Sequence, residues 1–156
     1  MSGHNGRRTQ AVSEFFANPL GYTTMSGASV RFARAFAQEG PETEAVVNIT
    51  VWNARGFQGG PGAVLEVKEM PLRRILADVA ANRPTQFTFD RPVPLFGLAY
   101  HVGVQLVYNG DSIAIATNRD GESVLGTSWE LDANGDWDLY LRANGLNVGH
   151  DINVNV

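Results

Sequence analysis

The chain has 156 residues, which is enough for one domain with a proper core and too few for two ordinary domains. Its net charge is −4 and its arginine and lysine residues form no basic stripe, so we expect no nucleic-acid partner. The absence of cysteine excludes a disulfide scaffold and cysteine-ligated zinc.

Most segments of the chain have the residue alternation of β-strands, and turn signals rich in glycine, proline and asparagine separate them. In residues 44–55, Val47, Ile49 and Val51 alternate with Asn48, Thr50 and Trp52, so the two sets occupy opposite faces of a strand. The same alternation runs through residues 98–108, where apolar residues oppose His101, Gly103 and Gln105. Further strands are predicted at 29–36, 62–70, 85–90, 112–117 and 151–156.

One segment departs from this alternation. Leu72, Ile75, Leu76 and Val79 recur at helical spacing after Pro71, which predicts one short helix near 71–82. Short strands joined by polar turns predict an all-β fold, an antiparallel two-sheet β-sandwich that is jelly-roll-like. We expect a single domain over residues 1–156. Because Met1 directly precedes "SGHN", we interpret the chain as a domain excised from a larger protein.

Trp52 falls on the polar face of its predicted strand, and this residue motivates the first candidate site. Tryptophan and tyrosine on a solvated sheet face can stack on sugar rings, while nearby amides and hydroxyls bind the sugar hydroxyls. The candidate ligand-binding residues here are Trp52, Asn48, Thr50, His101 and Gln105. The alternative is that a loop or an adjoining domain covers Trp52.

The stretch "SWELDANGDWDLY", residues 128–140, is predicted to form a hairpin around Asn134-Gly135. A two-residue turn would place Trp129 and Tyr140 together on one face and Trp137 with Leu139 on the core face. Trp129 and Tyr140 are therefore added to the candidate ligand-binding residues.

The tip of this hairpin also carries regularly spaced oxygen donors. Asp132, Asn134, Asp136 and Asp138 follow the spacing of a calcium loop, but Trp137 and Ala143 replace the glycine and glutamate of an EF-hand. An EF-hand is excluded, and three alternatives stay open: a plain hairpin, a hairpin that holds Ca²⁺, or a ligand platform.

No catalytic signature is present in the sequence. No serine has the glycine-flanked pattern of a hydrolase, and acidic pairs such as Glu66 and Glu69 are expected by chance among sixteen acidic residues. The three histidines have no metal-ligand spacing. We expect no enzyme activity and no required cofactor, with Ca²⁺ as the candidate ion.

Several stretches in order carry a resemblance to a known group: "SGHNG", "NITVWNARGFQGGPGAVLEVKEMPL", "YHVGVQL", "TSWELDANGDWDLY" and "GLNVGHDINVNV". The chain resembles an uncharacterised β-sandwich accessory domain of secreted and surface proteins from Bacteroidetes-type bacteria. Such domains adjoin peptidase or polysaccharide-degrading modules, and Trp52, Trp129 and Trp137 match their tryptophan positions. The helical insert at 71–82 departs from that pattern. The resemblance implies a secreted or cell-surface location and no catalytic residues.

Two functions follow as hypotheses. The first is a non-catalytic extracellular accessory module that binds carbohydrate through the aromatic sheet face. The second is a structural or protein-interaction module that packs against neighbouring domains of a secreted enzyme or adhesin. No apolar run approaches membrane-spanning length, so we expect no membrane insertion.

Overall fold

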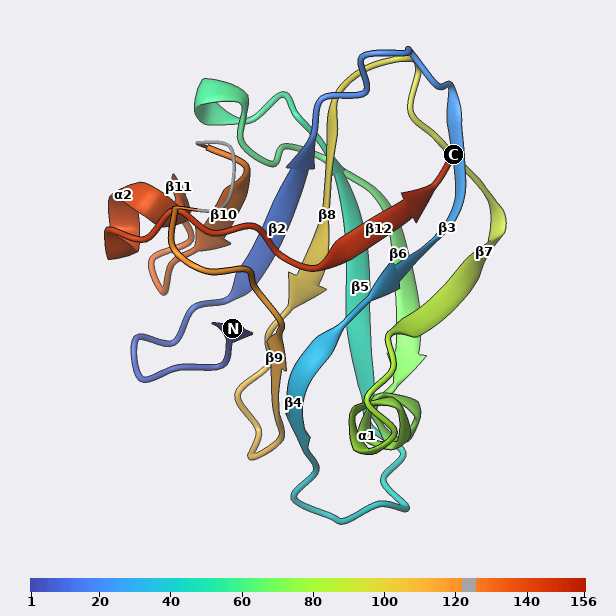
Figure 1. The fold of residues 1–156 in the computed structure, drawn as a ribbon, viewed down its shortest axis with the longest axis vertical. Coiled ribbons are helices and arrows are strands. Elements are labelled where there is room, and N and C mark those ends of the chain that lie inside the picture. The colour runs from blue at the N-terminus through green and yellow to red at the C-terminus, as the bar shows by residue number, and fades with distance from the viewer. Residues whose placement is uncertain (122–125) are drawn as a thin grey trace.

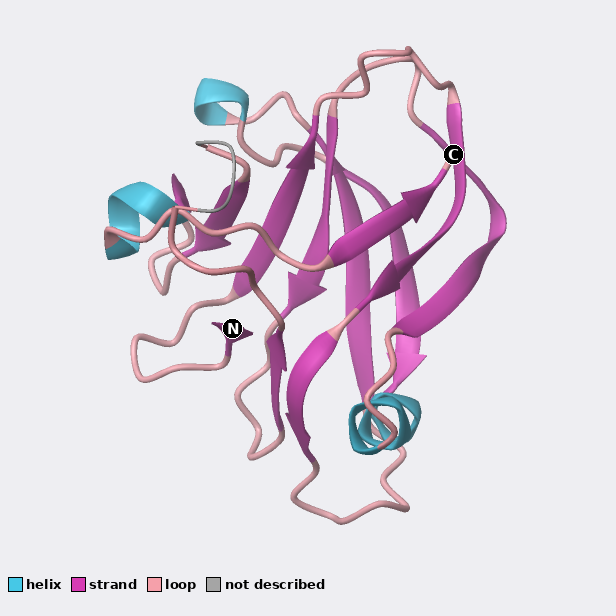
Figure 2. Cartoon of the chain, in the orientation of Figure 1, coloured by secondary structure: helices cyan, strands magenta, loops and turns pink. Residues whose placement is uncertain are grey.

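The structure, a computed structural model, describes residues 1–121 and 126–156. Strands hold 45% of the described residues and helices 11%, so the predicted all-β class is confirmed. Figure 2 shows how little helix lies among the strands. No helix in the described part of the chain combines the length and apolar character that a membrane span requires.

The largest sheet has six antiparallel strands. In spatial order they are β11 (Trp137–Leu139), β10 (Ser128–Leu131), β2 (Ala11–Phe16), β8 (Tyr100–Gln105), β5 (Val46–Asn53) and β6 (Val64–Pro71).

Two smaller sheets have three strands each. One contains β12 (Ile152–Asn155), β3 (Thr24–Val30) and β7 (Thr85–Pro94), and the other contains β1 (Ser2–Gly3), β9 (Ser112–Ile115) and β4 (Phe32–Phe36). In Figure 1, β3 and β12 cross in front of the six-stranded sheet. The short helices are η1 (Phe57–Gly59), α1 (Leu72–Ala80) and α2 (Tyr140–Asn144).

The apolar core lies between the six-stranded sheet and the two smaller sheets. It takes buried side chains from all three, among them Ile49 and Val104 from the large sheet, Val30 and Phe87 from one small sheet, and Ile113 from the other. Burying apolar side chains from the three sheets against one another is the main stabilising contribution in a fold of this kind. The predicted alternation therefore assigns the inward faces of β5 and β8 correctly.

The predicted helix near 71–82 forms as α1, whose first residue is Leu72, directly after Pro71. Leu72 and Ile75 are buried, as helical spacing predicts. Every predicted strand segment contains a strand, but the sequence reasoning did not find β2, which lies inside the six-stranded sheet. Its inward face carries Glu14 between Val12 and Phe16, which weakens the apolar pattern.

The late hairpin forms, but the predicted register is wrong by one residue. Trp129 pairs with Leu139 and Leu131 pairs with Trp137. The Asp132 amide donates to the Asp136 carbonyl at 2.9 Å, and Gly135 has a φ of +88°, so the loop has three residues and ends in a left-handed glycine. A shift by one residue exchanges the two faces of a strand. Trp129 therefore shares a face with Leu139 rather than with Tyr140.

Candidate functional site

The predicted ligand-binding residues of β5 and β8 lie together on the outer face of the six-stranded sheet. The two strands pair directly, with Trp52 opposite His101 and Thr50 opposite Gly103. On the other side of β8, Phe15 pairs with His101. The outer face is thus a continuous surface across β2, β8 and β5.

Most of this surface is covered, which agrees with the alternative in which another part of the structure covers Trp52. The Trp52 side chain is 5% exposed, and Thr50, His101 and Trp129 are also buried. Trp137 of the late hairpin contacts Trp52 edge-on, with ring centroids 5.2 Å apart. Asn48 and Gln105 are partly buried, and the Gln105 amide donates to the Thr50 hydroxyl at 3.0 Å.

His101 has a structural role beneath this surface. Its Nε2 lies 2.9 Å from the Gly59 carbonyl, which only accepts, so Nε2 carries the proton. Nδ1 then accepts from the Ser13 hydroxyl at 3.2 Å. Burial lowers the pKa of His101 to about 4, which keeps the ring neutral at pH 7. Ser13 and His101 have no exposed surface, so this pair has no access to a substrate.

The loop at 56–62, "GFQGGPG", lies on top of His101 and Trp129. A Cβ at Gly60 would lie 2.8 Å from Cζ3 of Trp129, so only glycine fits this close approach. Gln58 has a φ of +55°, and the Asn53 side chain accepts from the amides of Arg55 and Ala63 at 3.1 Å. These contacts fix the loop, which presents the Phe57 side chain 77% exposed to solvent.

Two hollows lie between these elements. The first, called the tip hollow, has a volume of about 520 Å³ and lies between the 56–62 loop and the late hairpin. Its lining residues are Phe57, Gln58, Pro61, Asp132, Gly135, Asp136, Trp137, Asp138 and Arg142.

The second, called the sheet hollow, has a volume of about 430 Å³ and opens onto the outer face of the sheet. Its lining residues are Gln10, Ala11, Trp52, Val64, Gln105, Leu106, Val107, Leu131 and Trp137. Trp137 lines both hollows, and together they are called the Trp137 groove.

The acidic side chains of the tip hollow have defined partners. One carboxylate oxygen of Asp132 accepts from the amides of Asn134 and Asp136, both at 2.9 Å. Asp138 pairs with Arg142 at 2.5 Å, while Asp136 is exposed. Gln10 holds the hairpin tip by donating to the Asp132 and Ala133 carbonyls. Of the predicted calcium donors, Asp132, Asp136 and Asp138 line one end of the groove and Asn134 does not. Asp132 and Asp138 are already hydrogen-bonded.

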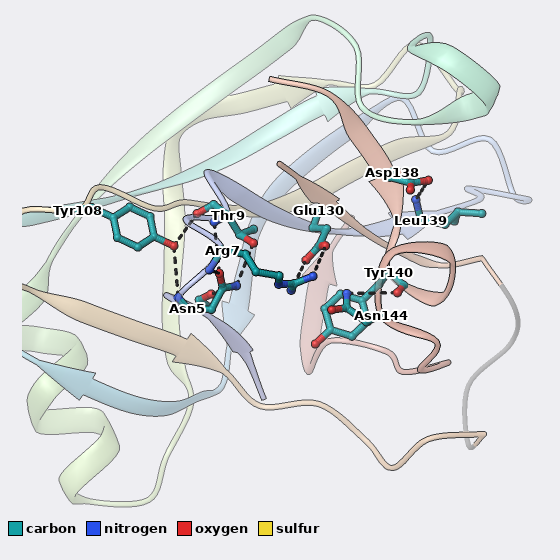
Figure 3. A network of polar contacts seen from close by, with 10 residues as sticks. Asn5, Arg7, Thr9, Tyr108, Glu130, Asp138, Leu139, Tyr140 and Asn144 are labelled. Atoms are coloured by element: carbon teal, nitrogen blue, oxygen red, sulfur yellow. Dashed lines mark hydrogen bonds and ion pairs between the residues drawn. The ribbon is translucent and has the colours of Figure 1, made fainter. Parts of the chain in front are cut away.

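A second polar region lies on the inner side of β10 and joins the N-terminal segment to the late hairpin (Figure 3). Arg7 approaches both carboxylate oxygens of the buried Glu130 at 3.3 Å. Burial raises the pKa of the nearby Tyr140 hydroxyl, and the charge of Glu130 raises it further. Tyr140 thus belongs to this region and lies away from Trp129, contrary to the prediction.

Glu14 and His150 meet in the same part of the fold. Glu14 Oε1 lies 3.3 Å from His150 Nδ1 and accepts from the His150 amide and the Ser128 hydroxyl. Burial opposes ionisation of Glu14, but the interactions with His150 prevail and its pKa lies below 4.5. Within the described residues, no group of three or more histidine or acidic side chains is arranged to hold a metal ion.

Sequence reasoning missed Phe57, Gln10 and Arg142 as members of the groove. The signal for Phe57 is present in "GFQGGPG", because an aromatic residue between glycines belongs to a tight loop and has few neighbours that could bury it. Trp137 was assigned to the core, yet it is half-buried on the outer face.

Comparison of the chain with known protein families, with characterised proteins and with solved structures gave no match.

Proposed function

We propose that the protein is a non-catalytic carbohydrate-binding module and that the Trp137 groove is its binding site. The observation that carries this proposal is the position of Trp137, which lines both hollows and packs edge-on against Trp52. Its half-buried indole is fixed on one side and available to a ligand on the other. An aromatic side chain held in this way can stack on the apolar C–H face of a pyranose.

Polar groups around the indole supply the hydrogen bonds that a sugar requires. Asp136 is exposed at the tip hollow, and Gln10 and Gln105 line the sheet hollow. Sugar hydroxyls both donate and accept, so carboxylates and amides suit them as partners. Volumes of about 520 and 430 Å³ fall within the usual size range of small-molecule sites.

The proposal includes a two-layer, jelly-roll-like β-sandwich as the scaffold. It is supported by the core, to which the six-stranded sheet and both smaller sheets contribute buried side chains. We also propose that the module belongs to a secreted or cell-surface bacterial protein, which the resemblance of "TSWELDANGDWDLY" and the "GGPG" loop supports.

A glycan array with the wild-type chain and two variants tests the function. Phe57→Ala removes an exposed side chain of the tip hollow, and Phe36→Ala removes an exposed phenyl ring on β4 that lines neither hollow. Specific binding by the wild type that Phe57→Ala weakens and Phe36→Ala retains supports the proposal. A blank array with the wild type contradicts it.

A second candidate function is a structural module that packs against a neighbouring domain. Leu20, Tyr22, Phe96 and Leu98 are exposed on two loops joined by a hydrogen bond from Asn18 to the Leu98 carbonyl. Exposed apolar patches on a rigid surface mark interaction sites. Hydrogen exchange over residues 18–23 and 95–98 tests this function. Slower exchange when the chain is joined to a further domain of a longer protein than when it is alone supports a covering domain, and equal rates count against it.

A further inference from the structure

The two hollows of the Trp137 groove adjoin one another, with Trp137 as their common wall. A ligand confined to one hollow would use one part of the indole surface and leave the rest in water. A ligand that crosses the indole would use both hollows and remove more apolar surface from water. The arrangement therefore favours an extended ligand over a compact one.

Each hollow offers apolar surface of its own beside Trp137. Phe57 stands at the tip hollow, and Val107 is exposed at the rim of the sheet hollow. Both side chains stand on backbone that the fold fixes: the 56–62 loop is held by His101, and Val107 lies just beyond β8, where its carbonyl lies 2.7 Å from His4 Nε2. Fixed surfaces of this kind lower the ordering cost of binding a semi-rigid chain.

The charges differ between the two hollows. The lining of the sheet hollow contains amides and apolar groups and no ionisable side chain. The lining of the tip hollow contains three carboxylates, of Asp132, Asp136 and Asp138, against one guanidinium, and Asp138 pairs with that Arg142. This excess of negative charge repels a carboxylated sugar and leaves an uncharged sugar unaffected.

We propose that the groove binds an internal stretch of a linear, uncharged glycan, with successive rings on both sides of Trp137. This inference rests on the proposed function and specifies its ligand class. Phe57 and Val107 contact different rings of the same chain, and Asp136 excludes uronic acids from the tip hollow. A disaccharide occupies one hollow only.

The test compares short and long probes in equilibrium binding to the purified chain. The neutral probes are cellobiose, cellohexaose, mannobiose and mannohexaose, and the acidic probe is a hexamer of galacturonic acid. The variants are Phe57→Ala in the tip hollow, Val107→Ser in the sheet hollow and Asp136→Asn at the acidic rim. Asp90→Asn is the matched charge control, because Asp90 is fully exposed on β7 and lines neither hollow.

We expect at least one neutral hexamer to bind about tenfold more tightly than its dimer, since a second stacked ring adds contact area. Both Phe57→Ala and Val107→Ser should weaken hexamer binding, and at most one of them should weaken dimer binding. Asp136→Asn should raise affinity for the acidic hexamer about threefold, as expected from removing one nearby like charge, whereas Asp90→Asn should not.

Three results would overturn the inference. Equal affinity for dimer and hexamer would show a site for a single ring or a chain end, while the proposed function would stand. Equal affinity for neutral and acidic hexamers would contradict the proposed selection against acidic glycans, again without affecting the proposed function. No binding of any glycan here or on the array would contradict both proposals.

Discussion

Trp137 contacts Trp52 edge-on, with ring centroids 5.2 Å apart and ring planes inclined by 78°. The pair joins the late hairpin at one edge of the six-stranded sheet to the second strand from the opposite edge, because Trp137 belongs to β11 and Trp52 to β5. Three strands separate β11 from β5 within the sheet, so this side-chain contact spans the outer face.

The two members of this pair should differ in their effect on stability. Trp52→Ala empties a buried position and should lower the free energy of unfolding by about 3–5 kcal/mol. Trp137→Ala removes a half-buried side chain and should cost roughly 1–2 kcal/mol. Urea unfolding monitored by circular dichroism measures both. Phe57→Ala, at a 77% exposed residue, is the control and should stay within about 0.5 kcal/mol. Equal costs for the two tryptophans would contradict the assigned burial.

His101 should make stability depend on pH in a defined window. Its pKa is lowered by burial from 6.5 to about 4, so between these values the unfolded chain binds a proton that the folded chain does not. Stability is therefore full above pH 6.5 and falls as the pH decreases toward 4, by about 3 kcal/mol from this group.

Unfolding in urea at several pH values measures this effect. His101→Gln keeps a donor and an acceptor but cannot titrate, so its stability should change less than that of the wild type across this window. Parallel profiles for the two proteins would show that His101 does not cause the dependence.

Gly60 should tolerate no side chain. A Cβ at this position would approach Trp129 to 2.8 Å and the Phe57 carbonyl to 3.1 Å, so Gly60→Ala should displace the loop and cost about 1–3 kcal/mol. Thermal unfolding measures the loss. Gly6→Ala is the control, because nothing lies within 4 Å of a Cβ there. A Gly60→Ala protein as stable as the control would mean that the loop does not pack on Trp129.

Calcium at the hairpin tip remains a prediction from the spacing of Asp132, Asn134, Asp136 and Asp138. If the site binds Ca²⁺, a concentration one hundred times the Kd should raise stability by about 2.7 kcal/mol, and the melting temperature should rise with it. Asp136→Asn should reduce the increase because it removes an anionic donor. A melting temperature that is unchanged by Ca²⁺ and by chelator would end this hypothesis.

The sequence predicted which face each residue of β5 and β8 occupies, because alternation within a strand is local. It could not predict what covers Trp52, since Trp137, which packs against it, belongs to a hairpin far along the chain. The register of the hairpin was also missed. Asn134-Gly135 favours a two-residue turn in general, but the Asp132 carboxylate bonds the amides of Asn134 and Asp136 and stabilises a loop one residue longer.

In the 56–62 loop, the residues that anchor the loop to the sheet differ from those whose side chains face the solvent. Its anchors are buried groups, namely His101 on the Gly59 carbonyl and Trp129 against Gly60, whereas Phe57 points into solvent and Gln58 is also exposed. Substitutions at position 57 can therefore alter the chemistry at the tip hollow with little effect on folding, whereas position 58 also requires a residue that tolerates a left-handed backbone. The same scaffold can present other side chains at this site, which makes the loop a natural place for related chains to diverge in specificity and for engineered ones to be given a new ligand.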